Sequence, residues 1–459
     1  MVTQQEKQVG NSMPGEKDKS LVYAWYIVII CMIAYIFSFI DRQILALLIQ
    51  PIRKDLHISD TQFSLLHGLA FSIFFSTMGI PIARLADRKS RPLIISVGVF
   101  FWSLMTAFCG LGRNFLQLFI SRMGVGVGEA ALAPPTYSMI RDFFPKEKMG
   151  LALSVFSLGA VLGSGIAYLV GGAVIKAVST MGAVSLPFVG ELTPWRVAFL
   201  IVGLPGLIIA LILFLTVKDP ERKGLLVKDD TGNIAAPAEV SFSEVLHFIW
   251  AHKGTFSGIY LGVCCTSIIF YGMLTWTPAF YLRNFKFSIF EISLYLGSLI
   301  LIFSTLGMLF SGWLLDFMYK RGYEDAAMRT AIIGSIGIFI TIIVYPLCSN
   351  FTLSLVFLAP ALFFNSFPFP AATAAMQLLT PSQMRAQVSA IFLLLLNVIA
   401  LGFGTTLIAL STDYLFKNDA AVGKSLALIG GIFSLMAIIL EWRSLKHYRN
   451  SMKETAHYR

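Results

Sequence analysis

The sequence predicts an all-α integral membrane protein with twelve transmembrane helices in two parallel six-helix repeats. Three observations predict this fold class: the composition, the length of the apolar stretches and an internal repeat. Apolar residues make up 56% of the 459 residues and charged residues only 13%, which is too apolar for a surface in water. Long apolar stretches recur along the chain, and about 20 apolar residues cross the roughly 30 Å of hydrocarbon in a bilayer. Twelve crossings fit this length.

The apolar stretches divide the chain into twelve expected helices. The first begins near Val22 behind a polar head; it is too long for a removable signal peptide and lacks a small-residue cleavage site. The first six helices are expected at residues 22–49, 61–84, 92–112, 115–143, 149–173 and 195–217. The second six are expected at residues 253–282, 289–319, 328–347, 351–379, 384–412 and 421–442.

The expected helices divide the chain into five segments. These are an N-terminal tail (1–21), a first half (22–217), a linker (218–252), a second half (253–442) and a C-terminal tail (443–459). In the linker, Ser241 and Glu244 stand three residues apart, and this spacing predicts a capping box that opens an amphipathic helix. Because this helix carries Phe248 and Trp250, we expect it to lie along the membrane surface.

The net charge of +10 is spread over alternate connections and does not form one patch. Basic residues cluster after expected helices 2, 4, 6 and 8, whereas the connections after helices 3, 5 and 9 carry Arg113, Lys176 and no basic residue. By the positive-inside rule, we expect a multi-pass protein of a cell membrane with both termini in the cytoplasm. The short loops favour a bacterial inner membrane. Topology therefore explains the basic balance, and no nucleic-acid partner is expected.

An internal repeat relates the two halves in the same order and orientation. Under one constant shift along the chain, four positions recur: Ser59, Ser64, Leu65 and Gly68 lie over Ser288, Ser293, Leu294 and Gly297. Under a second, slightly longer shift, further positions recur: Asn114, Phe115, Pro134, Pro145 and Phe156 lie over Asn350, Phe351, Pro370, Pro381 and Phe392. Duplicated halves are common among membrane transporters.

The connection after expected helix 2 carries a recognisable motif. Residues 83–91 read ARLADRKSR, and a weaker copy, GWLLD, occupies residues 312–316. With the parallel halves, this motif resembles the major facilitator superfamily, although Ala83 and Ser90 stand where that family usually has glycine. The resemblance implies the major facilitator fold, transport by alternating access, and a cytoplasmic latch. The latch residues would be Asp87, Arg88, Arg91 and Asp316; the alternative for Arg91 is a loop charge that only sets topology.

Two further motifs resemble a narrower family. Residues 39–42 read FIDR, residues 122–130 read RMGVGVGEA, and Pro134 and Pro135 follow. These motifs resemble the spinster family of lysolipid and sphingolipid transporters, and the whole looks like a bacterial homologue. The resemblance implies an amphiphilic lipid substrate such as a lysophospholipid or a sphingosine phosphate. Related organic-anion transporters share an arginine and glycines in helix 4, so a small organic anion, with Arg122 as its clamp, is the alternative.

Four ionisable residues lie within expected helices: Asp41 and Arg42 in helix 1, and Arg122 and Glu129 in helix 4. Such residues are costly in a membrane and usually mark function. Asp41 and Arg42 lie about 15 Å, and Arg122 about 12 Å, from the same membrane surface, so Asp41 and Arg122 are candidate partners, and the long arginine could reach either carboxylate. Glu129 lies two turns further along helix 4, on the face of Arg122. The alternative is a static network that only fixes helix packing.

We therefore expect these four residues to couple transport to protons, with Glu129 as the group that gains and loses the proton. Protonation would release Arg42 or Arg122 to hold an anionic headgroup. The repeat aligns Phe270, Tyr271 and Asn365 of the second half with Asp41, Arg42 and Glu129 of the first. If the substrate cavity lies between the halves, one wall is charged and the other is mainly aromatic.

The expected substrate-binding set is Arg42, Arg122, Glu129, Phe270, Tyr271, Asn365 and Phe369. The sequence carries no nucleotide-binding loop, metal-ligand cluster or nucleophile constellation, so an enzyme is not expected. The energy source would be the proton gradient, without a cofactor, and the protein is expected to be a monomer.

Overall fold

The computed structural model describes residues 14–454 except 183, 187–189, 221–226, 229–233, 236–240 and 382. In these residues, 12 helical spans are long and apolar enough to cross a membrane. Several spans consist of two or three consecutive elements, because short π-helical turns interrupt the α-helix. The predicted all-α architecture with twelve membrane helices is confirmed.

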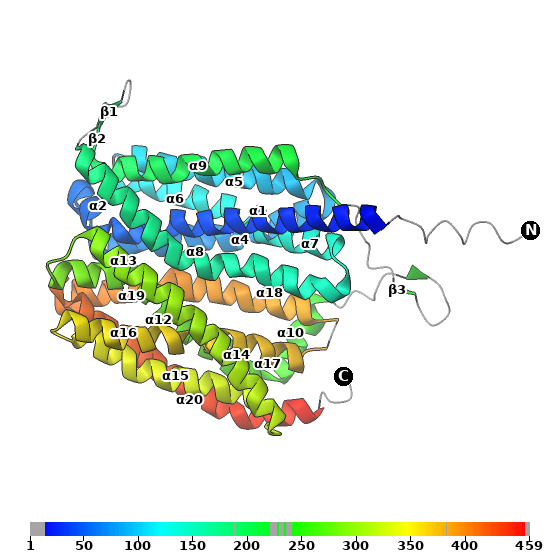
Figure 1. The fold of residues 1–459 in the computed structure, drawn as a ribbon. Helices are drawn as coiled ribbons and strands as arrows, with labels where there is room; N and C mark the ends of the chain where they lie inside the picture. The colour runs from blue at the N-terminus through cyan, green and yellow to red at the C-terminus, as the bar shows by residue number, and fades with distance from the viewer. Residues whose placement is uncertain are drawn as a thin grey trace, which may run out of the picture.

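The first half contains six of the spans (Figure 1). Its helices are α1 (Pro14–Leu47), α2 (Ile49–Leu56), α3 (Asp60–Ser64), η1 (Leu65–Leu69), α4 (Ala70–Arg88), α5 (Arg91–Leu111), α6 (Phe115–Glu129), α7 (Ala133–Phe143), α8 (Lys146–Met181) and α9 (Pro194–Thr216). The strands β1 (Val184–Leu186) and β2 (Gly190–Leu192) pair in an antiparallel hairpin between α8 and α9, with Ser185 opposite Glu191.

The second half follows a short linker that contains β3 (Val227–Lys228), β4 (Ile234–Ala235) and α10 (Phe242–Ala251). Its helices are α11 (Lys253–Ser257), η2 (Gly258–Gly262), α12 (Val263–Asn284), α13 (Ile289–Leu299), η3 (Ile300–Ser304), α14 (Thr305–Lys320), α15 (Ala326–Val344), η4 (Tyr345–Leu347), α16 (Phe351–Asn365), α17 (Pro368–Leu379), α18 (Arg385–Leu395), η5 (Leu396–Leu401), α19 (Gly402–Leu410), η6 (Ser411–Phe416), η7 (Asp419–Ala421) and α20 (Val422–Glu454).

Several helices run further than expected, and α1 begins at Pro14 instead of Val22. α8 continues to Met181 although its sequence carries Lys176, whose ammonium lies 4.1 Å from the centre of the Phe290 ring. α20 continues to Glu454, through the first part of the expected tail, because Tyr448 and Met452 are buried against the core of the second half. In the linker, the capping box of Ser241 and Glu244 is present and opens α10 as predicted.

The repeat is visible in how the helices begin. Ser59 caps α3 and Ser288 caps α13, each through a capping box with the side chain three residues later, Gln62 or Glu291. In a capping box, two otherwise unpaired backbone N–H groups are satisfied reciprocally. Ser59 and Ser288 are aligned by the first of the two repeat shifts, so the aligned positions perform the same structural task.

The two halves contact each other at one end of the bundle. Both chain ends lie at the other end, which we call the tail end, and we call the opposite end the far end (Figure 1). The main contacts between halves join α8 to α13 and η3, α19 to α3 and η1, and α1 to α12. By contrast, the main neighbours of α14 and α17, and of α7, all lie within their own halves. The halves therefore close on each other toward the far end.

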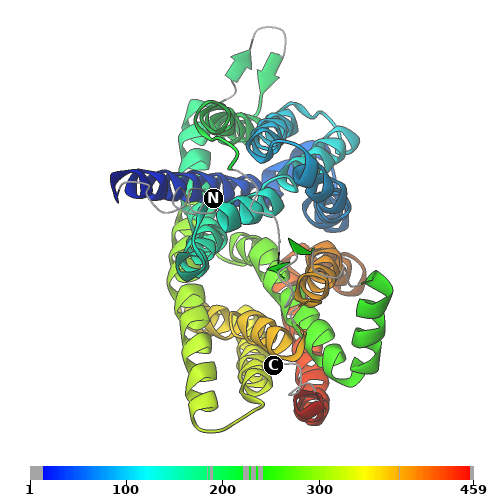
Figure 2. The same ribbon diagram turned by 90° about the vertical axis from the view of Figure 1, so that its right-hand side faces the viewer.

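The apolar core follows the same division. The largest cluster includes residues of both halves, such as Ile44 and Tyr168 with Met273 and Leu274. A second cluster is built mainly from the first half and a third wholly from the second half. Figure 2 looks onto the tail end, where the first half (blue to green) and the second half (yellow-green to red) form separate groups of helices.

Candidate functional site

Glu129 lies at a break in a membrane helix. It is the last residue of α6, and after the turn of residues 130–132 the span resumes as α7, which has Pro134 and Pro135 in its first turn. Asn365 has the same place in the second half: it ends α16, and the span resumes at Pro368 in α17. Since proline lacks a backbone N–H, it is tolerated at the start of a helix. Glu129 and Asn365, which the repeat aligns, therefore lie at corresponding breaks of the two halves.

Glycines make room for both breaks. A Cβ on Gly98 of α5 would lie 2.9 Å from the carbonyl oxygen of Gly128. A Cβ on Gly334 of α15 would lie 3.1 Å from the carbonyl oxygen of Phe364. The second, longer repeat shift aligns these two pairs, so the third helix of each half supports the break of the fourth. Small residues let membrane helices approach this closely.

Glu129 forms an ion pair with Arg42 of α1. Nε of Arg42 donates to Oε2 of Glu129 at 2.6 Å, and an Nη2 contact to the same oxygen completes the pair. The Glu129 side chain is 1% exposed and that of Arg42 12% exposed. Oε1 of Glu129 has no hydrogen-bond partner among the described residues. Arg42 is thus the less buried member of the pair.

Asp41 and Arg122 are neighbours, but their side chains do not pair with each other. Arg122 donates to the backbone carbonyl of Asp41 at 3.3 Å, while the Asp41 carboxylate has no ion pair among the described residues. Nη2 of Arg122 likewise lacks a partner there, and both side chains are buried. Similar depth does not by itself pair two side chains, because depth along a helix does not fix which side a residue faces. In this conformation Arg122 has no surface from which to touch a substrate.

Phenylalanine rings surround the two guanidiniums. Cζ of Arg42 lies 4.4 Å from the ring centre of Phe71, 5.0 Å from that of Phe39 and 5.2 Å from that of Phe75. Cζ of Arg122 lies 5.6 Å from the same Phe71 ring. A ring face attracts a cation most strongly where water is excluded. Phe71 therefore contacts both arginines, and the sequence analysis did not identify it.

The expected second-half residues divide into two groups. Phe270 and Tyr271 are adjacent on α12, half-buried, with ring centres 5.5 Å apart. Tyr271 packs against the core cluster of the first half and lies within electrostatic reach of Arg42. Asn365 is buried and its Oδ1 has no partner among the described residues, whereas Phe369 is 40% exposed. The structure thus brings Tyr271 to the charged cluster and leaves Asn365 and Phe369 in the second half.

The latch residues whose side chains the structure describes, Arg88, Arg91 and Asp316, do not form one cluster. Arg91 is buried at the start of α5, where it contacts Asp142 of α7 at 2.5 Å and Asp219, in the linker just after α9, at 2.7 Å. The burial of Arg91 and its two ion pairs give it a structural role in addition to any effect of its charge on topology. Arg88 and Asp316 are exposed and form no ion pair within the described part of the chain. The side chain of Asp87 lies outside the described residues.

A hollow lies beside the latch motif, at the tail end of α4. Its volume is about 540 Å³, and Pro81, Arg84, Leu85 and Arg88 line it. Both arginines are exposed. The hollow lies at the end where the two halves form separate groups of helices (Figure 2).

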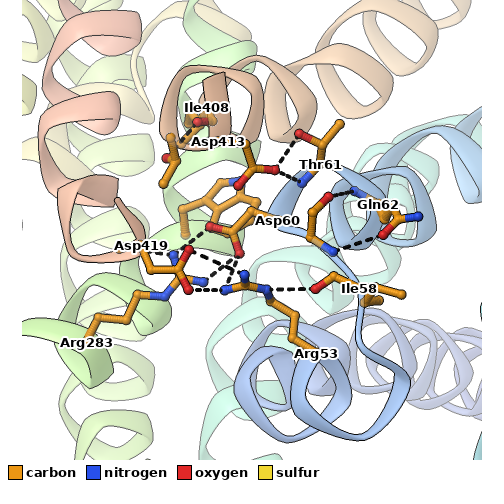
Figure 3. A network of polar contacts seen from close by, with 12 residues as sticks. Arg53, Ile58, Asp60, Thr61, Gln62, Arg283, Ile408, Asp413 and Asp419 are labelled. Carbon is orange, nitrogen blue, oxygen red and sulfur yellow. Dashed lines mark hydrogen bonds and ion pairs between the residues drawn. The ribbon is translucent and has the colours of Figure 1, made fainter. Parts of the chain in front are cut away.

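A second charged cluster lies at the far end (Figure 3), and the sequence analysis missed it. Its acidic members are Asp60, Asp413 and Asp419, and its arginines are Arg53 and Arg283. All lie at helix ends, where charged residues are ordinary, so no sequence signal separates them from loop charges. The structure distinguishes these residues from loop charges because the side chains of Asp60 and Arg283 are buried and belong to different halves.

These features define a class of protein: a multi-pass membrane protein whose two repeated halves meet at one end and enclose buried charges. A family model described as "Major Facilitator Superfamily" matches residues 31–405. The chain therefore belongs to the Major Facilitator Superfamily, and it is a transporter and not an enzyme.

Three relatives describe this membership more closely. A bacterial homologue of the human lysosomal transporter spinster, solved in an inward-facing and unoccupied conformation, superposes with a TM-score of 0.76 at 25% identity, over 98% of this chain and 99% of that one. An "MFS-type efflux pump" of Mycolicibacterium smegmatis is 26% identical over 94% of this chain and 95% of its own length. A "Hexuronate transporter" of Bacillus subtilis is 25% identical over 64% of this chain and 65% of its own length.

Proposed function

We propose that this protein is a proton-coupled secondary transporter of an amphiphilic lipid, such as a lysophospholipid or a sphingosine-phosphate-like lipid. It works by alternating access in a cell membrane, with the tail end in the cytoplasm. The observation that carries this proposal is the Arg42–Glu129 pair, whose arginine side chain is the less buried of the two, with Tyr271 of the other half within electrostatic reach. The overall similarity to a bacterial spinster homologue supports the lipid class.

Protonation of Glu129 is the switch in this mechanism. A protonated Glu129 no longer holds Arg42 by charge, so the guanidinium fork becomes available to an anionic headgroup. Removing one member of a buried pair costs about 3 to 5 kcal/mol, and a proton moving down 100 mV supplies about 2.3 kcal/mol, to which a pH gradient adds. The two magnitudes are comparable. Asp41, whose carboxylate is unpaired among the described residues, shares the coupling with Arg122.

The aromatic residues of the second half take the apolar part of the substrate. Phe270 and Tyr271 face the first half from α12, and Phe369 is exposed at the start of α17. Asn365 offers an unpaired amide oxygen at the break of its helix. A headgroup on the charged side and a chain on the aromatic side suit an amphiphile.

Replacing Glu129 with Gln tests the coupling. In proteoliposomes with a fluorescent lysophospholipid as the probe, we expect Glu129→Gln to remove the dependence of transport on pH, because the amide cannot take a proton. Glu191→Gln, at an exposed carboxylate of the β1–β2 hairpin, is the matched control and should keep the parent profile. An unchanged pH profile in Glu129→Gln contradicts the mechanism.

A small organic anion is the second candidate substrate. The similarity to a "Hexuronate transporter" favours it, as does the unpaired Nη2 of the buried Arg122, which a carboxylate could satisfy. Thermal unfolding of the purified protein with lysophospholipids or with glucuronate, at two pH values, separates the candidates. Stabilisation by glucuronate alone would replace the lipid with the anion as the substrate class.

A further inference from the structure

Five charged side chains join the halves at the far end: Arg53 and Asp60 of the first half, and Arg283, Asp413 and Asp419 of the second (Figure 3). We propose that they form an ionic lock that holds the far end closed. Asp60 and Asp413 are its central members, and their contacts to the opposite half must break before the far end can open. The proposal rests on the transporter fold and is independent of the substrate.

Asp60 is the buried centre of the lock. Both oxygens of its carboxylate accept from Arg283, Oδ2 from Nη1 and Oδ1 from Nη2, each at 2.6 Å. Such a bidentate pair is among the strongest polar contacts in proteins. Arg53 of the same half contacts Oδ1 of Asp60 at 2.9 Å and also reaches across to Asp419 at 2.8 Å. Opening the far end separates Asp60 from Arg283 and Arg53 from Asp419.

Asp413 caps a helix of the opposite half. Its Oδ2 accepts from the backbone N–H and from the hydroxyl of Thr61, each at 2.7 Å. Thr61 lies in the first turn of α3, whose N–H groups have no partner within the helix. Ser59 satisfies the N–H of Gln62, so the second half supplies the acceptor that Thr61 lacks. A carboxylate is also favourable at a helix N-terminus.

The lock differs from a cation site. Oxygens of Asp60, Asp413 and Asp419 lie close enough together to ligate an ion. However, the guanidiniums of Arg53 and Arg283 already occupy the space beside two of these carboxylates and neutralise them. The cross-half geometry therefore favours closure, not metal binding.

The lock is one-sided. Among the described residues, the ion pairs that join the two halves are Arg53–Asp419 and Asp60–Arg283, and both lie at the far end. At the tail end, Arg88 and Asp316 are exposed and unpaired within the described chain. Hence the charges stabilise one conformation, closed at the far end and open at the tail end. A proton or a substrate must offset this bias for the cycle to continue.

A cysteine reporter tests the lock without a known substrate. Ser64 is buried, and its hydroxyl lies 3.3 Å from that of Thr406 across the contact between the halves. In a variant whose five native cysteines are replaced, Ser64→Cys should react with a membrane-impermeant maleimide only when the far end opens. We expect Asp60→Asn to raise the labelling rate about tenfold or more, because it weakens the main bond across the contact.

Two further variants complete the test. Asp55→Asn removes a similar ion pair at the same end, but Asp55 bonds Arg196 at 2.9 Å within the first half, so labelling should stay at the parent rate. Asp413 bonds Thr61 and no arginine, so Asp413→Ala leaves no buried arginine unpaired. This variant should still accelerate labelling, and it tests the lock if Asp60→Asn does not fold. The proposal is overturned if folded Asp60→Asn and Asp413→Ala both label at the parent rate, or if Asp55→Asn accelerates labelling equally.

Discussion

Phe71 shows how a single uncharged residue shapes the charged site. Its buried ring lies between two guanidiniums, 4.4 Å from Cζ of Arg42 and 5.6 Å from Cζ of Arg122. Like charges repel more strongly where water is excluded. The negative face of the ring partly offsets this repulsion. Among the described residues, Arg42 has a carboxylate partner and Arg122 has none, so Arg122 depends more on the ring.

We predict that Phe71→Leu destabilises the protein beyond the loss of packing. The cation–ring attraction is worth about 2 kcal/mol at a desolvated site. Phe156→Leu is the matched control, since Phe156 is fully buried in the same half and packs against Tyr35 and Tyr137 instead of a cation. Thermal unfolding of the purified proteins should give Phe71→Leu the larger loss; equal losses would show that the ring acts only through packing.

At the scale of residues, the sequence identifies the charged candidate site residues more readily than it predicts the contacts between them. Asp41, Arg42, Arg122 and Glu129 stand out because each is ionisable within an apolar stretch. Their pairing depends on which side of each helix faces inward, and adjacent residues point about 100° apart. Phe71 is one of 39 phenylalanines, and nothing in the sequence separates it from a packing residue. The lock residues are equally hidden among ordinary charges at helix ends.

At the scale of elements, each half is fastened at the tail end by its own ionic contacts. In the first half, Arg91 at the start of α5 binds Asp219, which follows α9. In the second half, Asp325 immediately before α15 binds Arg449 near the end of α20 at 2.5 Å. Both contacts join the third helix of a half to its sixth, with the charges exchanged. They keep each half intact while the halves move apart.

The contact of Asp325 predicts a pH-dependent stability. Burial opposes ionisation of Asp325, but the hydrogen bonds from Arg329 and Arg449 outweigh it and lower the pKa of this carboxyl. A carboxyl whose pKa is lower in the folded state stabilises it above the unfolded pKa of about 3.9, and this contribution is lost as the pH falls through the folded pKa. Asp325→Asn should therefore lower the Tm at neutral pH, and the difference should shrink below about pH 4.

The control for this prediction is Asp316→Asn, which removes an exposed carboxylate without an ion pair in the described chain. Its Tm should match the parent at both pH values. A Tm difference for Asp325→Asn that stays constant between neutral and acidic pH would mean that ionisation of this carboxyl does not stabilise the fold.

At the scale of the whole molecule, the fold follows from composition, helix length and repeat, because lipid allows few alternatives to membrane-spanning helices. The conformation does not follow from them. Contacts within each half, such as the glycine contacts at the two helix breaks, are compatible with either end being closed. Which end closes depends on a few contacts between halves, and these join residues far apart in the sequence, such as Asp60 and Arg283.

The halves touch closely where α8 crosses α13, and this crossing gives the last prediction. A Cβ on Gly165 would lie 3.0 Å from the carbonyl oxygen of Gly297, and a Cβ on Gly297 would lie 2.9 Å from that of Gly165. Gly165→Val should therefore push the helices apart and speed maleimide labelling of Ser64→Cys. Gly150→Val, in the same helix with nothing within 4 Å of its Cβ, should leave the rate unchanged. Equal rates for the two valine variants would show that this crossing does not control closure of the far end.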